Sequence, residues 1–282
     1  MHPILFEIAG HQIRTYSVAM AIGFVVTIIL LRRRSAYEQL DVNFVLNCCI
    51  LCVFGTIVGG RAVFVLTTWE ERFAANWVDV FKVWEGGLVF YGGFFGSILF
   101  VSLYSLLKRQ QILRLFDLFS PYVGLGLAIH RPLGCFMNGC CYGAPTSMPW
   151  GVHFPVEAFA TKVYGVTQTL HPTQIYMGIN GLFLFFLLRW YRQRKKRHGE
   201  VFALLLMVYA VDRFIIELFR GDDIRGFVGR FSTSQLIGLG TFLAGALIFL
   251  YARKWGRPVQ PEFGRIAEDA AAAPGPEFSS AH

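Results

Sequence analysis

The chain has 282 residues, of which 55% are hydrophobic, only 16% are charged and 28 are phenylalanine. Soluble proteins carry roughly 25% charged residues, so this composition excludes an ordinary soluble protein and favours one bundle of helices in lipid. The net charge of +8 sits in short clusters rather than on one face. Such clusters are typical of membrane proteins oriented by their basic loops, and they argue against a nucleic-acid partner.

Seven segments are long and apolar enough to cross a bilayer as helices, which needs about 20 residues each. They are residues 15–31, 43–66, 87–107, 114–131, 174–191, 200–220 and 233–252. The predicted fold is therefore all-α, a polytopic membrane protein with about seven transmembrane helices. No basic region precedes the first segment and no small-residue cleavage site follows it, so we expect a retained span. Residues 1–255 form the expected transmembrane domain, and the Ala-, Pro-, Gly- and Ser-rich residues 256–282 are predicted to be a disordered cytoplasmic tail.

Basic residues follow the first, third, fifth and seventh segments, and they predict the orientation of the chain. These clusters are Arg32 to Arg34, Lys108 with Arg109 and Arg114, Arg192 to Arg197, and Arg253 to Arg257. The alternate connections, residues 67–86 and 143–173, hold few basic residues and several acids. We therefore expect a periplasmic N-terminus, a cytoplasmic C-terminus and two periplasmic segments. Residues 221–232 fit this pattern least well, because they hold Arg225 and Arg230.

The six cysteines are Cys48, Cys49, Cys52, Cys135, Cys140 and Cys141. Most lie in apolar runs or next to another cysteine, which is poor geometry for a disulfide framework. No histidine or second cysteine pair supports a zinc site at the first three, so we interpret them as small packing residues. The role of the Cys140–Cys141 pair stays open. The sequence indicates no metal and no organic cofactor.

Charged residues inside spans are costly in lipid and by default mark a functional site. In the sixth segment, Tyr209, Arg213, Glu217 and Arg220 recur at helical spacing and form one stripe, which must face the bundle interior. A structural Arg213–Glu217 pair that only holds helices together would produce the same stripe.

Other polar residues lie at a similar depth, towards the outer ends of four further segments. They are Arg14 and Tyr16, Arg61, Glu85 with Tyr91, and Arg131. Independent structural pairs would have no reason to share a depth, so we predict one polar cavity near the outer leaflet. Several arginines around a cavity match the oxygens of a phosphate, which in a membrane is most often a lipid head group.

Glycines recur at helical spacing in the second and third segments, at Gly55, Gly59 and Gly60 and at Gly92, Gly93 and Gly96. The Gly55–Gly59 and Gly92–Gly96 spacings predict close contact between helices. Gly86 and Gly87 precede the third segment and could form a break that lines the cavity.

Seven motifs occur in the order typical of one enzyme family. They are MHPILFEIAG at the start, Tyr16 within RTYSVAMAIGF, Gly59-Gly60-Arg61, WEGGLVFYGGFFG at 84–96, LGCFMNGCCYG at 133–143, HPTQIY at 171–176 and YAVDRFIIELFRGDD at 209–223. From about His2 to Tyr251 the chain resembles the prolipoprotein diacylglyceryl transferase family. The resemblance implies transfer of the diacylglyceryl group from phosphatidylglycerol to the lipobox cysteine of exported prolipoproteins, at the periplasmic side of a bacterial inner membrane.

The resemblance also implies roles for individual residues. Arg213 matches the family's essential arginine and would neutralise phosphate, while Glu217 would orient it and Tyr209 would bond to lipid oxygens. Arg131 would be the second arginine that binds phosphatidylglycerol. Arg61 would serve either as a third cation or in a structural role.

The chain departs from the family's pattern at two positions. Within residues 130–134 the arginine stands one place earlier than usual and Pro132 takes its place, so Pro132 would have to bend the helix for Arg131 to reach the site. Tyr91 stands where some members have a histidine proposed as general base, and tyrosine, with a pKa near 10, is a poor base. The replacement candidates are His130, which would otherwise be a helix-end residue, and His171, which would otherwise be a cap or turn. The substrate thiolate could also react without a dedicated base.

Asn138, Gly139 and Gly143 match the family's turn after the fourth segment. They would bring backbone N–H groups towards the head group, or they would form a plain helix-ending turn. Two other functions stay open from sequence alone. One is a divergent relative that uses another lipid or acceptor, and the other is a phospholipid-binding membrane protein without catalysis.

Overall fold

A computed structural model describes residues 4–8, 11–38, 40–74, 76–83, 87–156, 158–221, 227–228 and 231–259. The predicted site residue Glu85, the loop residues Arg225 and Arg230, and the tail from residue 260 onward lie outside these described residues. The chain divides into two compact units, Met1–Leu31 with Phe116–His282 and Arg32–Leu115. Each unit is described by itself.

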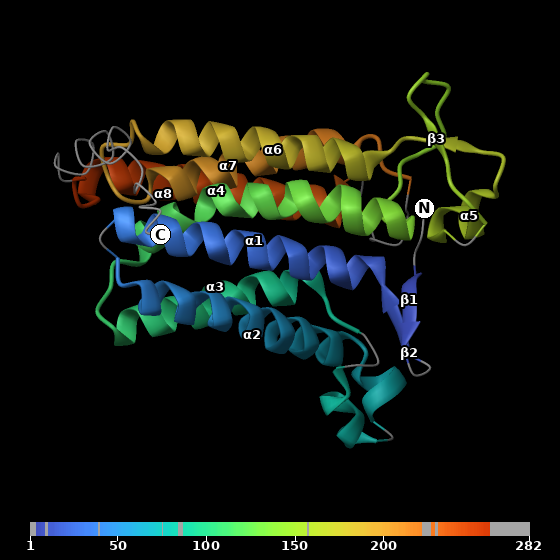
Figure 1. The fold of residues 1–282 in the computed structure, drawn as a ribbon, viewed down its shortest axis with the longest axis horizontal. Helices are drawn as coiled ribbons and strands as arrows, with labels where there is room; N and C mark the ends of the chain where they lie inside the picture. The colour runs from blue at the N-terminus through green and yellow to red at the C-terminus, as the bar shows by residue number, and fades with distance from the viewer. Residues whose placement is uncertain are drawn as a thin grey trace, which may run out of the picture. The chain divides into compact units, whose positions relative to one another are not determined.

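The described chain is mostly helical (Figure 1). The helices are α1 (Thr15–Tyr37), α2 (Val42–Thr67), α3 (Phe90–Leu107), α4 (Ile112–His130), α5 (Phe159–Tyr164), α6 (Thr173–Arg192), α7 (Glu200–Glu217) and α8 (Thr233–Trp255). Three further helical turns are η1 (Trp69–Phe73), η2 (Trp77–Phe81) and η4 (Arg131–Phe136). Each of the seven predicted segments thus contains one long helix. The sixth of these, α7, ends at Glu217 and not at the predicted residue 220, so Arg220 lies beyond it.

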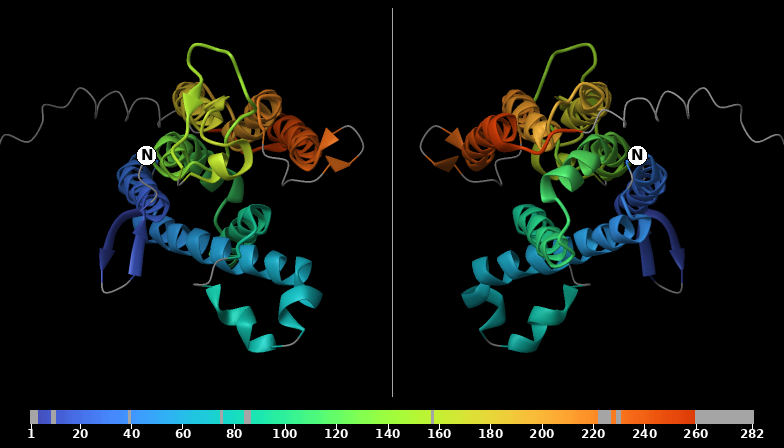
Figure 2. Two further views of the ribbon diagram at one scale, coloured as in Figure 1. Left: turned by 90° about the vertical axis from the view of Figure 1, so that its right-hand side faces the viewer. Right: turned by 90° about the vertical axis from the view of Figure 1, so that its left-hand side faces the viewer.

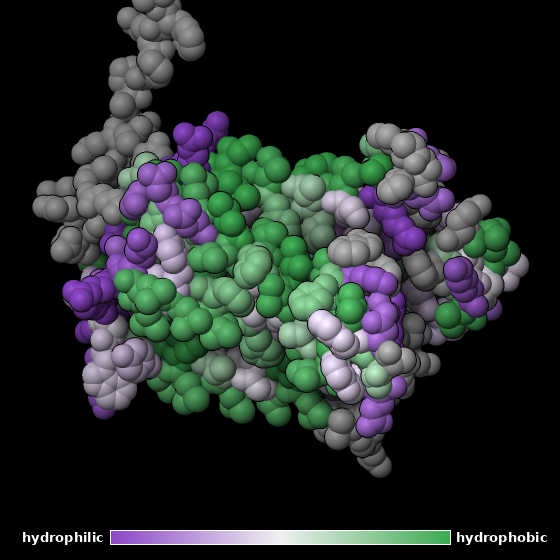
Figure 3. Space-filling view, turned by 90° about the horizontal axis from the view of Figure 1, so that it is seen from below, coloured by the Kyte–Doolittle hydropathy of each residue, from purple (hydrophilic) through white to green (hydrophobic). Residues whose placement is uncertain are grey.

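Four of the described helices are long and apolar enough to cross a membrane by length and composition. They are Thr15–Ala36, Val42–Thr67, Ile112–Phe136 and Thr233–Trp255, and Tyr91–Leu107 is a shorter apolar helix. The α7 helix is outside this group because it carries Glu200, Asp212, Arg213 and Glu217 within its 18 residues. On the face drawn in Figure 3, hydrophobic residues cover a broad area and hydrophilic residues gather towards its ends. Exposed leucines such as Leu107 and Leu247, at 81% and 67% exposure, are the expected surface of helices that face lipid.

The described chain is mostly helical, in agreement with the predicted all-α class, and three short antiparallel hairpins accompany the helices. They are β1 (Ile4–Ile8) with β2 (His11–Arg14), β3 (Val152–His153) with β4 (Thr169–Leu170), and β5 (Phe227–Val228) with β6 (Phe231–Ser232). All three lie outside the apolar segments. Backbone groups there do not have to be satisfied within one helix, as they must in lipid, so short strand pairs can form.

In the larger unit, α6, α7 and α8 lie side by side, as Figures 1 and 2 show. Leu184 and Leu188 of α6 pack against Val201 and Leu205 of α7 in a fully buried cluster. Beside them the carboxylate of Asp117 in α4 accepts hydrogen bonds from Lys195 Nζ at 3.1 Å and from two backbone N–H groups at 2.9 Å. This buried ion pair ties α4 to the connection between α6 and α7.

In the smaller unit, α2 packs against α3 through glycines at the predicted spacing. A methyl group at Gly59 would lie 2.2 Å from the carbonyl oxygen of Gly92, and one at Gly55 would lie 2.7 Å from that of Gly96. Only hydrogen fits at these positions, because backbone meets backbone. The predicted close contact between these two helices is therefore confirmed.

Candidate active site

The fourth span continues beyond its predicted end at Arg131. The structure carries α4 directly into the six-residue π-helical turn η4, so the apolar helix runs to Phe136. Pro132 has no N–H and crowds the carbonyl of the preceding turn, which disfavours a regular α-helix there. A π-helical turn is a common response to such a disruption and is frequent at functional sites.

Residues from three elements meet around this turn. The rings of Tyr16 in α1 and His130 in α4 lie edge to face with centroids 4.6 Å apart. His130 Nε2 lies 3.7 Å from the Sγ of Cys135, and Arg131 Nη1 lies 3.9 Å from the same sulfur. Arg131 is also within electrostatic range of Tyr16 and of Tyr209 in α7. The displaced arginine therefore lies near Tyr16, His130 and Tyr209.

Two nitrogen atoms in this cluster lack a hydrogen-bond partner among the described residues. They are His130 Nδ1 and Arg131 Nε, and both are buried. Buried polar atoms are nearly always hydrogen-bonded, so each exception needs an explanation. Arg131 Nε–H is a permanent donor, and His130 Nδ1 donates or accepts according to the tautomer of its ring, so the two atoms offer hydrogen bonds to a ligand.

Tyr209, Arg213 and Glu217 of the predicted stripe lie on α7, and residues at the start of α8 bind two of them. Arg213 and Glu217 form an ion pair in which both side chains are largely buried. Glu217 accepts a hydrogen bond from Ser232 Oγ at 3.0 Å, and Arg213 Nη2 donates to Ser234 Oγ at 3.4 Å. These contacts join α7 to α8, as the structural alternative requires, and they also fix the direction of the Arg213 side chain. Tyr209 lies one turn earlier on α7 and is within electrostatic range of Arg131.

The turn after η4 uses backbone groups internally, as the alternative of a plain helix-ending turn requires. Gly139 N–H donates to Phe136 O at 3.1 Å, and Gly143 N–H donates to His171 O at 2.9 Å. Gly139 adopts a left-handed φ of 66°, as a helix-ending glycine does. A methyl group at Gly143 would lie 2.4 Å from His171 Cβ, so this glycine permits close packing, and the side chain of Asn138 is only partly buried.

His171 joins neighbouring segments. Its Nδ1 lies 3.1 Å from the hydroxyl of Tyr176, which accepts a hydrogen bond from Trp150 Nε1 at 2.7 Å. Its backbone N–H donates to Ala144 O at 3.0 Å. These contacts match the cap or turn that the sequence left open as the alternative to a base.

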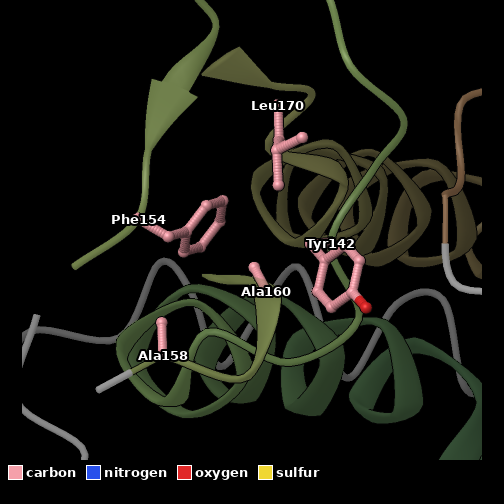
Figure 4. Close-up of a cluster of buried hydrophobic side chains, with 5 residues drawn as sticks. All are labelled: Tyr142, Phe154, Ala158, Ala160 and Leu170. Atoms are coloured by element: carbon pink, nitrogen blue, oxygen red, sulfur yellow. The ribbon is translucent and has the colours of Figure 1, made fainter. Parts of the chain in front are cut away.

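The segment that precedes α6 has a small core of its own (Figure 4). Its buried members are Tyr142, Phe154, Ala158, Ala160 and Leu170. The core rests on the turn after η4, because Ala160 N–H donates to Gly139 O at 3.1 Å. The motifs at 133–143, 171–176 and 209–223 meet beside this core. Gly143 N–H donates to His171 O, and Ala144 N–H donates to Phe219 O, just beyond α7, at 2.9 Å.

In the smaller unit, Arg61 has the structural role. Its guanidinium donates to Val80 O at 2.8 Å, to Asp79 O at 2.6 Å and to Gly87 O at 3.4 Å. It also lies over the rings of Phe64 and Phe73. The side chain is buried among these partners and holds the connection between α2 and α3, as the structural alternative requires. Tyr91 lies half-buried in the first turn of α3, and its role stays a prediction.

Sequence reasoning missed Asp212 and Asn180, which line a groove of about 510 Å³ between α6 and α7. The remaining lining residues are Tyr176, Ile179, Phe183, Ile215, Ile216 and Phe219. Asp212 Oδ2 and Asn180 Nδ2 are buried and have no hydrogen-bond partner within the described chain. A carboxylate inside an apolar segment was the available signal, but Asp212 is off the stripe that contains its neighbour Arg213.

Comparisons with known proteins show the family of this chain. The profile of the prolipoprotein diacylglyceryl transferase family matches residues 3–251. A phosphatidylglycerol–prolipoprotein diacylglyceryl transferase of Clostridium tetani is 36% identical over 249 residues, which cover 88% of this chain and 97% of that protein. Enzymes with this name from Clostridium perfringens and Bordetella bronchiseptica are 32% and 33% identical, over 91% and 89% of this chain and 98% and 95% of their own lengths. The chain therefore belongs to the prolipoprotein diacylglyceryl transferase family.

Proposed function

We propose that the protein transfers the diacylglyceryl group of phosphatidylglycerol to the lipobox cysteine of exported prolipoproteins. Family membership supports this reading, since the named relatives carry both substrates in their names. The structural observation that carries it is buried Arg131, which has an unused Nε and lies beside His130 and Tyr16. The transfer would form a thioether and release glycerol phosphate.

The charge that develops in this reaction explains the need for arginine. The sulfur attacks the glycerol carbon, the bond from that carbon to the phosphate oxygen breaks, and a phosphate diester becomes a monoester dianion. Positive groups that meet this charge in a buried site stabilise the transition state. Arg131 would do so, and Arg213, oriented by Glu217, would bind the head group from α7. Tyr16 and Tyr209 would hydrogen-bond lipid oxygens.

The attacking thiol also has to lose a proton. A cysteine thiol has an unperturbed pKa of about 8.5, so few molecules are thiolate at neutral pH. His130 Nδ1 has no partner within the described residues and would accept that proton. His171 would instead shape the site through its contacts with Tyr176.

The same proposal includes the topology. All seven long helices would cross a bacterial inner membrane, with the N-terminus in the periplasm and the C-terminus in the cytoplasm. Residues 1–255 would form the transferase domain, with segments 67–86 and 143–173 in the periplasm and residues 256–282 as a disordered tail. The site around Arg131 would then open towards the outer leaflet, where exported prolipoproteins arrive.

The direct test uses the purified full chain in detergent micelles that contain phosphatidylglycerol, together with a lipobox peptide. Mass spectrometry should detect a diacylglyceryl adduct on the peptide cysteine. A peptide with serine in place of that cysteine is the matched control and should stay unmodified. Absence of any adduct with phosphatidylglycerol and with other anionic phospholipids would refute the proposed activity.

A further inference from the structure

Three thiols from one short stretch of the chain, residues 135–141, converge next to Arg131. The Sγ atoms of Cys135, Cys140 and Cys141 all lie within 4.8 Å of one another. Cys135 is buried in η4, and the other two follow in the turn. Among the described residues this is the one group of at least three histidine, cysteine or acidic side chains with such spacing.

Two side chains of α6 hold the backbone of this cluster in place. Thr173 Oγ1 donates to Cys141 O at 2.7 Å, and Gln174 Nε2 donates to Cys140 O at 2.8 Å. Both donors are fully buried, and Cys140 N–H donates to Cys135 O at 3.1 Å. The Thr-Gln pair at the start of α6 therefore positions the two vicinal cysteines and does not contact solvent.

The backbone at Cys141 is unusual as well. Its φ is 60°, in the left-handed region that side chains other than glycine, asparagine and aspartate rarely adopt. Such conformations persist where the surrounding structure enforces them and are concentrated at functional sites. At Cys141 the left-handed backbone occurs where its Sγ lies within 4.8 Å of the other two sulfur atoms.

The spacing of the sulfurs matches a known coordination chemistry. Zinc binds thiolates at about 2.3 Å in a tetrahedron, which places sulfurs roughly 3.8 Å apart. The observed upper limit of 4.8 Å is within a small side-chain adjustment of that value. His130 Nε2, at 3.7 Å from Cys135 Sγ, is adjacent to the cluster.

A positive group lies beside the three thiols, because Arg131 Nη1 is 3.9 Å from Cys135 Sγ. Metal ions bind the thiolate and not the thiol. Arg131 therefore adds a positive charge next to the thiolates that a metal ion would bind.

We propose that Cys135, Cys140 and Cys141 bind one thiolate-seeking metal ion of the Zn²⁺ class, with the fourth coordination position open to water. Binding replaces three S–H bonds by three metal–sulfur bonds and releases three protons to solvent. No electron is transferred. A dication with three thiolates has a net charge of −1 and lies next to the Arg131 guanidinium.

That charge gives the site a regulatory consequence, which rests on the proposed transferase function. An anionic metal–thiolate group would pair with Arg131 and compete with the phosphate of the lipid. Occupancy by Zn²⁺ should therefore lower the transfer rate about tenfold, a typical size for coupling between two sites.

Metal binding can be measured without any transfer reaction. The full chain is purified in detergent, reduced, freed of metal with a chelator and titrated with Zn²⁺ against a chromophoric chelator. Co²⁺ serves as a second probe, because thiolate ligands give it an intense charge-transfer absorption. We expect one Zn²⁺ per chain and at least about tenfold weaker binding in Cys141→Ser and Cys135→Ser, since lost ligands cost metal affinity.

The chain offers a matched control in the other three cysteines. The variant Cys48→Ser, Cys49→Ser, Cys52→Ser should bind Zn²⁺ as the parent protein does. Binding that disappears in this control, or that persists unchanged in Cys135→Ser and Cys141→Ser, would overturn the proposal, as would absence of Zn²⁺ binding by the parent protein.

The regulatory consequence is tested separately with the lipobox peptide assay. Zn²⁺ should slow the parent protein and the α2 control variant reversibly, and it should have much less effect on Cys141→Ser. If Zn²⁺ binds at the three thiols but no protein forms an adduct, the transferase proposal fails and the metal site stands. If adduct forms without Zn²⁺ binding, the metal site fails and the transferase proposal stands.

Discussion

Arg131 stands one position earlier in the sequence than the family's arginine, yet it lies among polar residues of other helices. Pro132 prevents a regular α-helix after His130, and the wider π-helical turn that follows leaves Arg131 within electrostatic range of Tyr16 and Tyr209. The guanidinium keeps one buried nitrogen without a partner among the described residues. Its position is therefore set by the geometry of the turn and is suited to an anionic ligand.

Replacement of Arg131 should remove most of the transfer activity. We expect Arg131→Ala to lower kcat/KM by about 10²–10³, the usual effect of losing one group that stabilises developing negative charge. Arg131→Lys should recover only part of this loss, because an ammonium cannot make the bidentate contact of a guanidinium. The measurement is the rate of peptide adduct formation. Equal rates for all three proteins would contradict the assigned role.

His130 is tested best through the pH dependence of the reaction. If its imidazole removes the thiol proton, His130→Gln should be slower at neutral pH by about 10²–10⁴, the usual contribution of a general base. The deficit should shrink as the pH rises towards about 8.5, where the substrate thiol ionises by itself. A constant deficit across the pH range would instead assign His130 a positioning role.

At the scale of elements, Asp117 joins three parts of the larger unit. Its carboxylate is fully buried, pairs with Lys195 and accepts two backbone hydrogen bonds from Gly199 and Phe202. These contacts anchor the start of α7, the helix that carries Tyr209 and Arg213. Gly199 and Phe202 lie at the start of α7, far along the helix from Tyr209 and Arg213. Asp117 therefore supports the site through the placement of α7.

Loss of this buried carboxylate should destabilise the protein strongly. We expect Asp117→Ala to lower the free energy of unfolding by about 3–5 kcal/mol, because Lys195 would be left as a buried charge without its partner. The matched control is Lys82→Ala, which breaks a much more exposed pair with Asp79 and should cost about 0–1 kcal/mol. Unfolding in detergent followed by circular dichroism compares the two. Similar losses would mean that burial of Asp117 is not what makes its pair important.

For the whole molecule, the distribution of basic residues predicts which side each end of the chain faces. A fluorescent protein that folds only in the cytoplasm should be bright when fused after Trp255. The same protein inserted after Gly165, at the end of α5, should be dark, because segment 143–173 is expected in the periplasm. Alkaline phosphatase, which needs the periplasm, should give the reverse pattern. Bright fluorescence at both sites would exclude the proposed orientation.

The sequence alone determined where the helices lie and which family the chain resembles. Hydropathy is a local property, so each of the seven apolar segments could be recognised without knowledge of its neighbours, and the helices begin and end close to the predicted bounds. Ordered motifs from the N-terminal segment to residue 223, just after α7, carried the resemblance for the same reason. The glycine spacings in α2 and α3 predicted their close contact correctly, because glycines at helical spacing leave one face of each helix without side chains.

Only the tertiary structure decided what individual polar groups do, because their partners lie far away in the sequence. The sequence left Arg61 open between a cation and a structural role, and the structure adds hydrogen bonds from its guanidinium to the carbonyls of Asp79 and Val80. The sequence also left the turn at Gly143 open between two roles, and the structure adds a hydrogen bond from its backbone N–H to His171 O. The carbonyls of Cys140 and Cys141 accept hydrogen bonds from the side chains of Gln174 and Thr173 in α6. No local pattern encodes such contacts, since they arise only when separate helices pack.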